Sequence, residues 1–193
     1  MGKREEQKAE RKFAILLAGL DLFVRRGYNA TKIADIAKEL NMSVGLLFHY
    51  FESKEKLYEE LVRLGLSGSQ SLSELPMDPE HPLEFFEQTA AFILDNMREP
   101  MVTKMFVLMS QAALNDAAPQ AVKDLVARED SIEMSIPLIE AGQKLGIIKD
   151  GNPKALSLAY WGCIQGIAEE LAQCPGEPIP DPSWVVDILR KVP

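Results

Sequence analysis

The chain has 193 residues, a formal net charge of −8, and only two cysteines and two histidines. This length is enough for one small and one larger domain with buried cores. Cys163 and Cys174 lack paired or C-x-x-C spacing, and His49 and His81 stand alone, so we expect no disulfide framework, no metal site and no cofactor. The longest uncharged run, residues 155–168, has 14 residues, which is too short to cross a bilayer and predicts no membrane segment.

The first predicted element is a supporting helix that ends near Gly27. Arg25 and Arg26 in its last turn complement the negative end of the helix dipole, and Gly27 suits a left-handed position just after the helix. The helix has an apolar stripe made of Phe13, Leu16, Leu17, Leu20, Phe23 and Val24.

Residues 31–58 have the pattern of two short helices and the start of a third. Thr31 is the expected N-cap of the first helix. Apolar residues recur along it at helical spacing, namely Ile33, Ile36, Ala37 and Leu40. Residues 41–43 break this spacing, and Ser43 and Ser53 are placed to cap the second and third helices.

The second of these helices is expected to be buried on one side only. Leu47 and Phe51 face the interior in this pattern. The residues left outward are Val44, Gly45, Leu46, Phe48, His49 and Tyr50. A helix, a tight turn and a short outward-facing helix form an arrangement that can enter a DNA groove.

The stretch from Gly27 to Leu57 resembles the DNA-binding motif of the tetracycline-repressor (TetR) family of bacterial transcription regulators. The matching segments occur in order and at family spacing: GYNAT, DIAKELNMSVG, LLFHYF and SKEKL. The segment EAGQKLGIIKDGNP, residues 140–153, looks like the family's join between its seventh and eighth helices. The rest of the chain matches the family only in architecture.

The resemblance implies two sets of DNA contacts. Backbone phosphates are expected to be bound by Thr31, Ser43, His49, Tyr50 and Lys54. The remaining expected DNA-binding residues are Val44, Gly45, Leu46 and Phe48. Val44 and Leu46 stand where the family commonly has hydrogen-bonding side chains, and Phe48 where it has a tyrosine. We therefore expect apolar contact with thymine methyl groups and a contribution from DNA shape.

The charge is unevenly divided along the chain. Residues 1–66 carry 12 basic and 10 acidic residues, whereas residues 67–193 carry 9 basic and 19 acidic residues. Phosphate would repel the acidic part, so the first part is expected to meet the DNA. An acidic surface that only maintains solubility is equally compatible with these counts.

The serine and proline content of residues 67–82 predicts a helix end and a connection, which gives domains at 1–66 and 67–193. Five further helices are predicted at about 83–97, 101–115, 119–145, 153–173 and 182–192. Pro137 should kink or split the third of them. The predicted fold is all-α with about nine helices: an N-terminal three-helix helix-turn-helix domain, then a helical ligand-binding and dimerisation domain.

Small side chains follow one face of the predicted helix 153–173, and the resemblance implies that this helix pairs with its copy in a homodimer. The expected dimer residues are Ala155, Ala159, Gly162, Cys163 and Gly166, together with Trp184 and Ile188 of the final helix. Packing within one chain would explain the same face equally well.

The first helices of the second domain are rich in phenylalanine and methionine, which favours either a plain core or an adaptable pocket. Because related regulators hold an inducer among these helices, the resemblance implies a ligand site. The expected ligand-binding residues are Phe86, Met101, Met105, Phe106, Met109, Trp161 and Gln165.

These features predict a cytoplasmic, homodimeric regulator that binds a palindromic double-stranded operator. We expect a repressor that a small apolar or amphipathic ligand releases from DNA. The alternative is a helix-turn-helix scaffold or adaptor that acts through protein contacts without an inducer. An enzyme is not expected, because GLSG at residues 65–68 is one residue short of a nucleophile elbow and no glycine-rich phosphate loop occurs.

Overall fold

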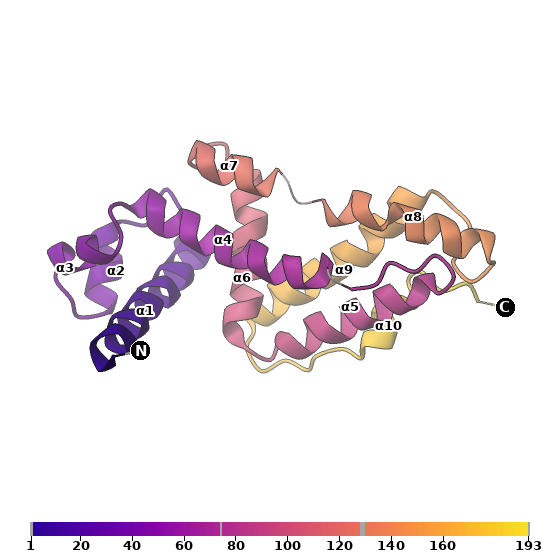
Figure 1. Cartoon of the computed structure of the whole chain (residues 1–193), viewed down its shortest axis with the longest axis horizontal. Coiled ribbons are helices and arrows are strands. Elements are labelled where there is room, and N and C mark those ends of the chain that lie inside the picture. Colours follow the sequence, from indigo (N-terminus) through magenta and orange to yellow (C-terminus); the bar gives the residue numbers. More distant parts are fainter. Residues whose placement is uncertain (1, 74, 128–129, 193) are drawn as a thin grey trace. The chain divides into compact units, whose positions relative to one another are not determined.

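The computed structural model describes residues 2–73, 75–127 and 130–192. Within these ranges the chain is helical, with one isolated antiparallel bridge between Ile148 and Arg190. The helices are α1 (Lys3–Arg26), α2 (Ile33–Glu39), α3 (Val44–Tyr50), α4 (Lys54–Ser73), α5 (Pro82–Asn96), α6 (Pro100–Leu114), α7 (Gln120–Val126), α8 (Ser131–Lys144), α9 (Pro153–Gln173) and α10 (Pro182–Val186) (Figure 1). No helix in the described ranges is long and apolar enough to cross a membrane. The predicted all-α architecture of about nine helices is confirmed.

The chain divides into two compact units, which are described separately here. The first consists of Met1–Leu66 and Val107–Arg128, and the second of Ser67–Phe106 and Glu129–Pro193. In this division residues 107–128 group with residues 1–66. The domains at 1–66 and 67–193 stay a prediction. Helices α4 and α6 each contribute residues to both units.

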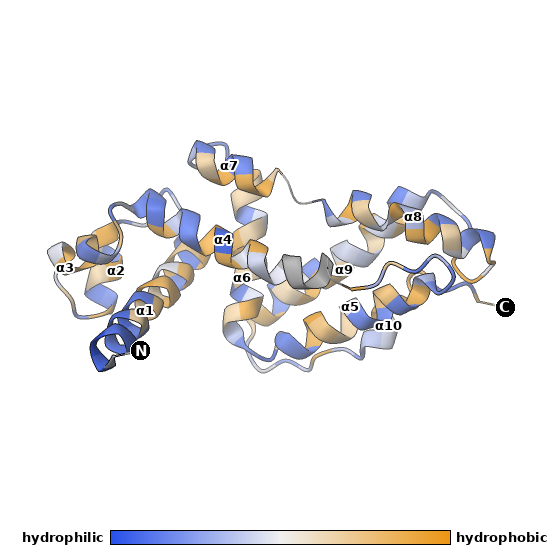
Figure 2. Ribbon diagram, viewed as in Figure 1, coloured by the Kyte–Doolittle hydropathy of each residue, from blue (hydrophilic) through white to orange (hydrophobic). Residues whose placement is uncertain are grey.

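The first unit is built around α1, whose first turns are hydrophilic and whose later turns carry the apolar residues (Figure 2). Gly19 lets α1 approach α4 closely, because a Cβ atom at this position would lie 2.6 Å from Cδ2 of Leu57. At the end of α1 the ring of Phe23 packs against Tyr58, with 5.0 Å between the centroids, and against Tyr28 at 5.9 Å. Gly27 follows with the predicted positive φ, at 79°.

The turn between α2 and α3 is a Schellman motif centred on Asn41. The N–H of Asn41 donates to the carbonyl of Lys38 (3.1 Å), and the N–H of Met42 donates to the carbonyl of Ala37 (2.9 Å). Asn41 itself has φ 51° and is the only non-glycine residue with positive φ in the described part of the chain. The motif ends α2 and leads, two residues later, to the cap of α3.

One predicted cap is wrong. The N-cap of α2 is Lys32, whose backbone N–H donates to Asp35 Oδ2 (3.2 Å), and not Thr31. Thr31 turns its hydroxyl toward α1 instead and donates to the carbonyls of Leu22 and Gly27. The other two predicted caps are confirmed, since Ser43 Oγ accepts from Leu46 N–H and Ser53 Oγ accepts from Lys56 N–H, each at 3.2 Å.

The second unit is organised around α9, which lies alongside α8 (Figure 1). A buried pair of hydroxyl groups joins the two helices, with 2.7 Å between Ser135 Oγ and Ser157 Oγ. The Tyr160 hydroxyl donates to the carbonyl of Phe86 at 2.7 Å and so connects α9 to α5. The join between α8 and α9 is compact because Gly142 leaves room for Ile148, whose Cδ1 would lie 2.4 Å from a Cβ at position 142.

Two predicted boundaries differ from the structure, at the end of α4 and within the predicted helix 119–145. Helix α4 continues past the predicted end at residue 67 to Ser73. The predicted helix 119–145 is two helices, α7 and α8, and the proline at 137 lies inside α8 rather than at the break. Residue 74 of the predicted connection and residues 128–129 of the predicted helix lie outside the described residues.

The last predicted helix, 182–192, ends at Val186 because the chain that follows pairs with the α8–α9 join. Lys149 N–H donates to Leu189 O, and Lys191 N–H donates to Ile147 O, each at 2.8 Å. The Lys149 ammonium also donates to the carbonyls of Asp187 and Ile188, each at 2.9 Å. The carbonyls of Asp187, Ile188 and Leu189 thus accept hydrogen bonds from Lys149 instead of from later residues of the same helix, and α10 ends before them.

The left-handed turn residue gives a test of the local fold. Asn41→Ala should lower the free energy of unfolding by about 1 kcal/mol, since a Cβ-bearing side chain without a local hydrogen-bonding group is disfavoured there. Asn41→Gly should not destabilise the protein. Urea unfolding with an unchanged m value would measure both effects. Asn29→Ala, at an exposed turn position with negative φ, is the matched control, and an equal loss there would contradict the explanation.

Candidate nucleic-acid interface

Helix α3 is fixed by its cap and by one buried side chain. Ser43 Oγ accepts the Leu46 N–H, and Ser43 O accepts the Leu47 N–H at 3.1 Å. Leu47 is fully buried, and Phe51, just after the helix, is 4% exposed. The two residues predicted to face the interior therefore do so, and they determine which side of α3 faces solvent.

The outward side of α3 is apolar. Val44, Leu46 and Phe48 are 37%, 37% and 44% exposed, and all three lie on one short helix. Gly45 lies between the first two, and no atom lies within 4 Å of the place a Cβ would occupy. This surface suits a major groove, where the thymine C5-methyl group offers an apolar contact.

Polar groups border this apolar surface. His49 is exposed and Tyr50 is half-buried, with their rings edge to face at 5.8 Å between centroids. Ser43 is exposed, and its hydroxyl oxygen already accepts a bond. A hydroxyl that accepts can still donate its own proton, so Ser43 keeps a donor for a phosphate oxygen.

Thr31 and Lys54, the other two residues predicted to bind DNA phosphates, pack within the first unit. Thr31 is fully buried as a whole residue, and its hydroxyl donates to the carbonyls of Leu22 and Gly27. Lys54 is half-buried, and its ammonium donates to the carbonyls of Tyr28 (2.8 Å) and Thr31 (3.0 Å). Their phosphate contacts stay predictions.

A second link in this region was not predicted from the sequence. The Tyr28 hydroxyl donates to Glu55 Oε1 at 3.0 Å. Burial raises the pKa of Tyr28, and the nearby Glu55 carboxylate raises it further. The pKa of Glu55 is lowered, first by its hydrogen bond with Ser53. The two residues are 27 positions apart, and nothing in the local pattern indicates that they meet.

The small-residue face of α9 lies on the surface of the chain. Ala155, Ala159, Gly162 and Gly166 are exposed, and Cys163 is half-buried. Nothing lies within 4 Å of a Cβ built at Gly162 or Gly166. Leu158, which the sequence analysis did not select, is 58% exposed on the same face. Of the two predicted residues in and after α10, Trp184 is 67% exposed and Ile188 is half-buried.

The predicted ligand residues do not all lie together. Met109 belongs to the first unit and the other six to the second. Phe86 is fully buried, Met105 is buried, and Phe106 and Trp161 pack against the same core as Phe86, while Met101 is half-buried. The polar groups are already bonded: Trp161 Nε1 donates to Ser135 Oγ at 3.2 Å, and Gln165 Nε2 donates to Glu169 Oε1 at 2.8 Å.

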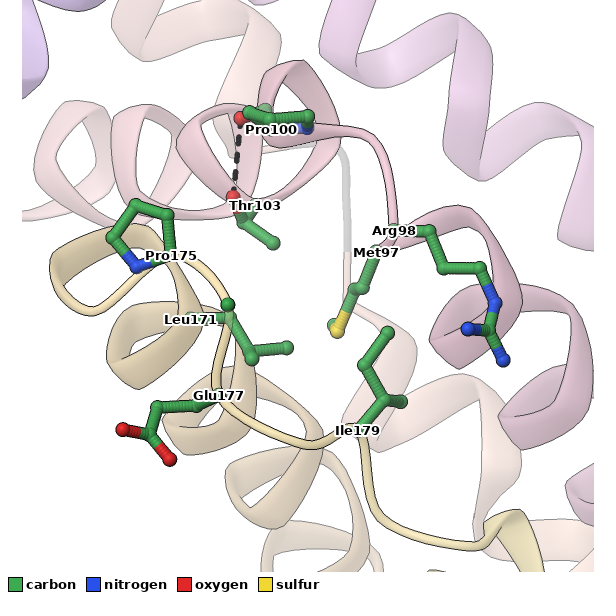
Figure 3. A pocket seen from close by; sticks show the side chains of 9 residues that line it. Met97, Arg98, Pro100, Thr103, Leu171, Pro175, Glu177 and Ile179 are labelled. Carbon is green, nitrogen blue, oxygen red and sulfur yellow. Dashed lines mark hydrogen bonds between the residues drawn. The ribbon is translucent and has the colours of Figure 1, made fainter.

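The second unit has a cavity of about 200 Å³ elsewhere, between the α5–α6 corner and the loop that joins α9 to α10. Met97, Leu171 and Ile179 point toward one another across it, whereas Arg98 and Glu177 point away (Figure 3). The Thr103 hydroxyl is bonded to the carbonyl of Pro100 at 3.1 Å. The lining is therefore mixed, with one apolar side formed by Met97, Leu171 and Ile179 and polar atoms over much of the rest. None of the seven predicted ligand residues lines this cavity.

Comparisons with known proteins agree with this geometry. Residues 15–61 match the family described as bacterial regulatory proteins, tetR family. The chain is 29% identical over 146 residues to an uncharacterised HTH-type transcriptional regulator, YhgD, of Bacillus subtilis (strain 168), covering 75% of each chain. It is 27% identical over 169 residues to the HTH-type transcriptional regulator RutR of Escherichia coli (strain K12), covering 87% of this chain and 78% of that one.

The fold is also similar to that of solved structures. The crystal structure of AibR in complex with isovaleryl coenzyme A and operator DNA aligns with a TM-score of 0.65 at 15% identity, over 92% of this chain and 94% of that chain. The match over residues 15–61 includes α2, its Schellman turn and the outward-facing α3. The helix-turn-helix segment at residues 15–61 is therefore that of the tetR family of bacterial regulatory proteins, and the chain is similar to HTH-type transcriptional regulators over three quarters or more of its length.

Proposed function

We propose that the protein is a homodimeric repressor that reads its operator through α3 and releases it when a small apolar ligand binds the second unit. The observation that carries the proposal is the outward-facing apolar surface of α3, held by a single buried leucine. A short helix reads few bases, so two copies related by a two-fold axis would bind half-sites about 34 to 36 Å apart. This spacing calls for a palindromic operator.

Apolar side chains distinguish bases chiefly by the thymine methyl group, and Val44, Leu46 and Phe48 have no hydrogen-bonding groups in their side chains. His49 is the polar residue of α3 that is exposed, and we assign it to a base edge or a phosphate. Ser43 and Tyr50 are assigned to backbone phosphates, which position a protein on DNA without reading sequence.

Replacing half-site thymines by uracil removes only the methyl group, so it should weaken operator binding. Each contacted methyl should contribute about a four-fold change in affinity, from about 0.8 kcal/mol per buried carbon. Binding to unrelated DNA at the same salt concentration should not change. Gel-shift titrations of the two duplexes measure the effect. Equal affinity for both duplexes would show that DNA shape, not methyl contact, gives the specificity.

The dimer is assigned to the small-residue face of α9, because Ala155, Ala159, Gly162 and Gly166 are exposed in the described chain, while Cys163 at the edge of the face packs against the core. Its opposite face buries Tyr160, Ile164 and Ala168 in the core. A helix surface of alanine and glycine allows a second helix to approach closely, and Leu158 adds an exposed apolar side chain to the contact. An isologous interface of this kind is self-complementary.

Gly166→Trp should therefore yield a folded monomer. Apart from its own helix backbone, no atom of the described residues lies within 4 Å of a Cβ at this position, so the fold should tolerate the side chain while the partner helix is excluded. Operator affinity should fall at least ten-fold, because each monomer then binds one half-site. Sedimentation velocity measures the assembly, with Ala91→Trp on the exposed side of α5 as the matched control. If Gly166→Trp remains a dimer, the interface does not lie on this face of α9.

The ligand is assigned to the cavity beneath the α9–α10 loop rather than to the predicted residues, because the side-chain N–H donors of Trp161 and Gln165 already have partners within the chain. A cavity of about 150 Å³ is known to bind benzene, so 200 Å³ is enough for one substituted ring or a short acyl chain. Because Arg98 and Glu177 point away from the space, the occupant should be uncharged (Figure 3). The AibR structure, which contains both an acyl compound and operator DNA, supports a link between ligand and operator.

Toluene, used as a probe at one hundred times its Kd, should raise the free energy of unfolding by about 2.7 kcal/mol and lower operator affinity. Ile179→Phe fills the cavity and should remove both effects. Ile147→Phe, which places the same substitution at a partly exposed position outside the cavity, should keep them.

Thermal unfolding with and without toluene measures the binding. If Met105→Ala with Phe106→Ala abolishes the response and Ile179→Phe does not, the ligand lies among the predicted residues. If neither the wild type nor any variant is stabilised by toluene or other small apolar compounds, a regulator that works without an inducer is favoured.

A further inference from the structure

The ammonium group of Lys54 connects two ends of the helix-turn-helix segment. It lies 2.8 Å from the carbonyl oxygen of Tyr28 and 3.0 Å from that of Thr31, and it donates to both. Both carbonyls belong to the turn between α1 and α2, whereas Lys54 is the first residue of α4. The ammonium also lies 4.1 Å from the centroid of the Tyr28 ring, where a cation is attracted to the aromatic face.

This contact closes a loop that contains the whole DNA-reading segment. Helices α2 and α3 and the Schellman turn lie between Thr31 and Lys54 in the sequence. Closing such a loop restricts the conformations of everything inside it. The position of α2 relative to α4, and with it the direction of α3, therefore depends on how firmly the two ends are held.

The neighbouring contacts hold the same turn from other sides. The Tyr28 hydroxyl donates to Glu55, the residue after Lys54. The Thr31 hydroxyl donates to carbonyls at the end of α1, and the Tyr28 ring packs 4.6 Å from the ring of Tyr58 in α4. The Lys54 ammonium is the group in this set whose two hydrogen bonds bind the α1–α2 turn directly to the first turn of α4.

We propose that Lys54 is a positioning residue for operator recognition, which holds the start of α2 against the start of α4 so that α3 meets the major groove in the correct direction. Two of its three N–H donors are used for this purpose. In this role Lys54 acts through α3, and phosphate is bound by other residues. The inference concerns how the regulator achieves specificity and does not depend on the proposed inducer or dimer interface.

The two roles predict different salt dependence. If Lys54 binds a DNA phosphate, Lys54→Met should weaken binding to operator and to unrelated DNA alike. It should also reduce the magnitude of the slope of log K against log salt by about 1. For a positioning residue, it should weaken operator binding by about ten-fold, the size expected for hydrogen bonds to a charged group. Affinity for unrelated DNA and the salt slope should stay as in the wild type.

Lys56→Met is the matched control. Lys56 lies in the same helical turn and carries the same charge, but its ammonium binds Glu59 at 2.9 Å and does not contact the turn. This variant should leave the ratio of operator to unrelated-DNA affinity unchanged. The measurements are made well below the melting temperature of each variant, so that a general loss of stability does not alter the ratio.

A second variant keeps the test decisive if Lys54→Met folds poorly. Lys54→Gln removes the charge but retains an N–H₂ donor one bond closer to the backbone. Positioning predicts that it keeps more of the operator preference than Lys54→Met, and that α2 amide hydrogens exchange faster in Lys54→Met than in Lys54→Gln. Equal losses in the two variants, with a reduced salt slope and unchanged exchange, would overturn the proposal.

Discussion

The turn at Asn41 is the constraint on which the DNA-reading surface depends. Its two hydrogen bonds end α2, and the left-handed residue changes the chain direction so that Ser43 can cap α3 two positions later. Because α3 has only seven residues, it would not form alone in water, where helix nucleation is costly. It is stable because the turn and its cap supply the first hydrogen bonds and Leu47 anchors it in the core.

One-sided burial then decides what α3 offers to DNA. With Leu47 inside, the side chains of Val44, Leu46 and Phe48 face outward and give α3 an exposed apolar surface. The free-energy cost of exposing these side chains is offset by packing elsewhere in the first unit. There Phe23, Tyr28 and Tyr58 pack together, and Gly19 lets α1 lie close against α4. The packed part of the first unit thus stabilises a helix whose outer side stays exposed.

The same division between an anchored side and an open side occurs in α9. Tyr160 donates to the carbonyl of Phe86, and Ser157 joins Ser135 of α8, so one side of the helix is committed to the interior. The other side carries alanine, glycine and an exposed leucine. In both helices a buried hydrogen bond or a buried side chain determines the orientation, and the surface left over is the one available to a partner.

By itself the sequence determined the helical periodicity, the serine caps, Gly27 and the burial of Leu47 and Phe51, because these depend on neighbours within a few residues. It also indicated α9 with the bounds that the structure has, from Asn152 as cap to residue 173. It misplaced the cap of α2, the break in residues 119–145 and the end of α10. Only the tertiary structure decided that Lys54 and Glu55 meet the α1–α2 turn, that Lys149 draws the chain after α10 out of the helix, and that the cavity lies beside Met97 rather than among the predicted residues. Those contacts join residues 23 to 82 positions apart, and no local pattern encodes which distant carbonyl or side chain a long, flexible group will reach.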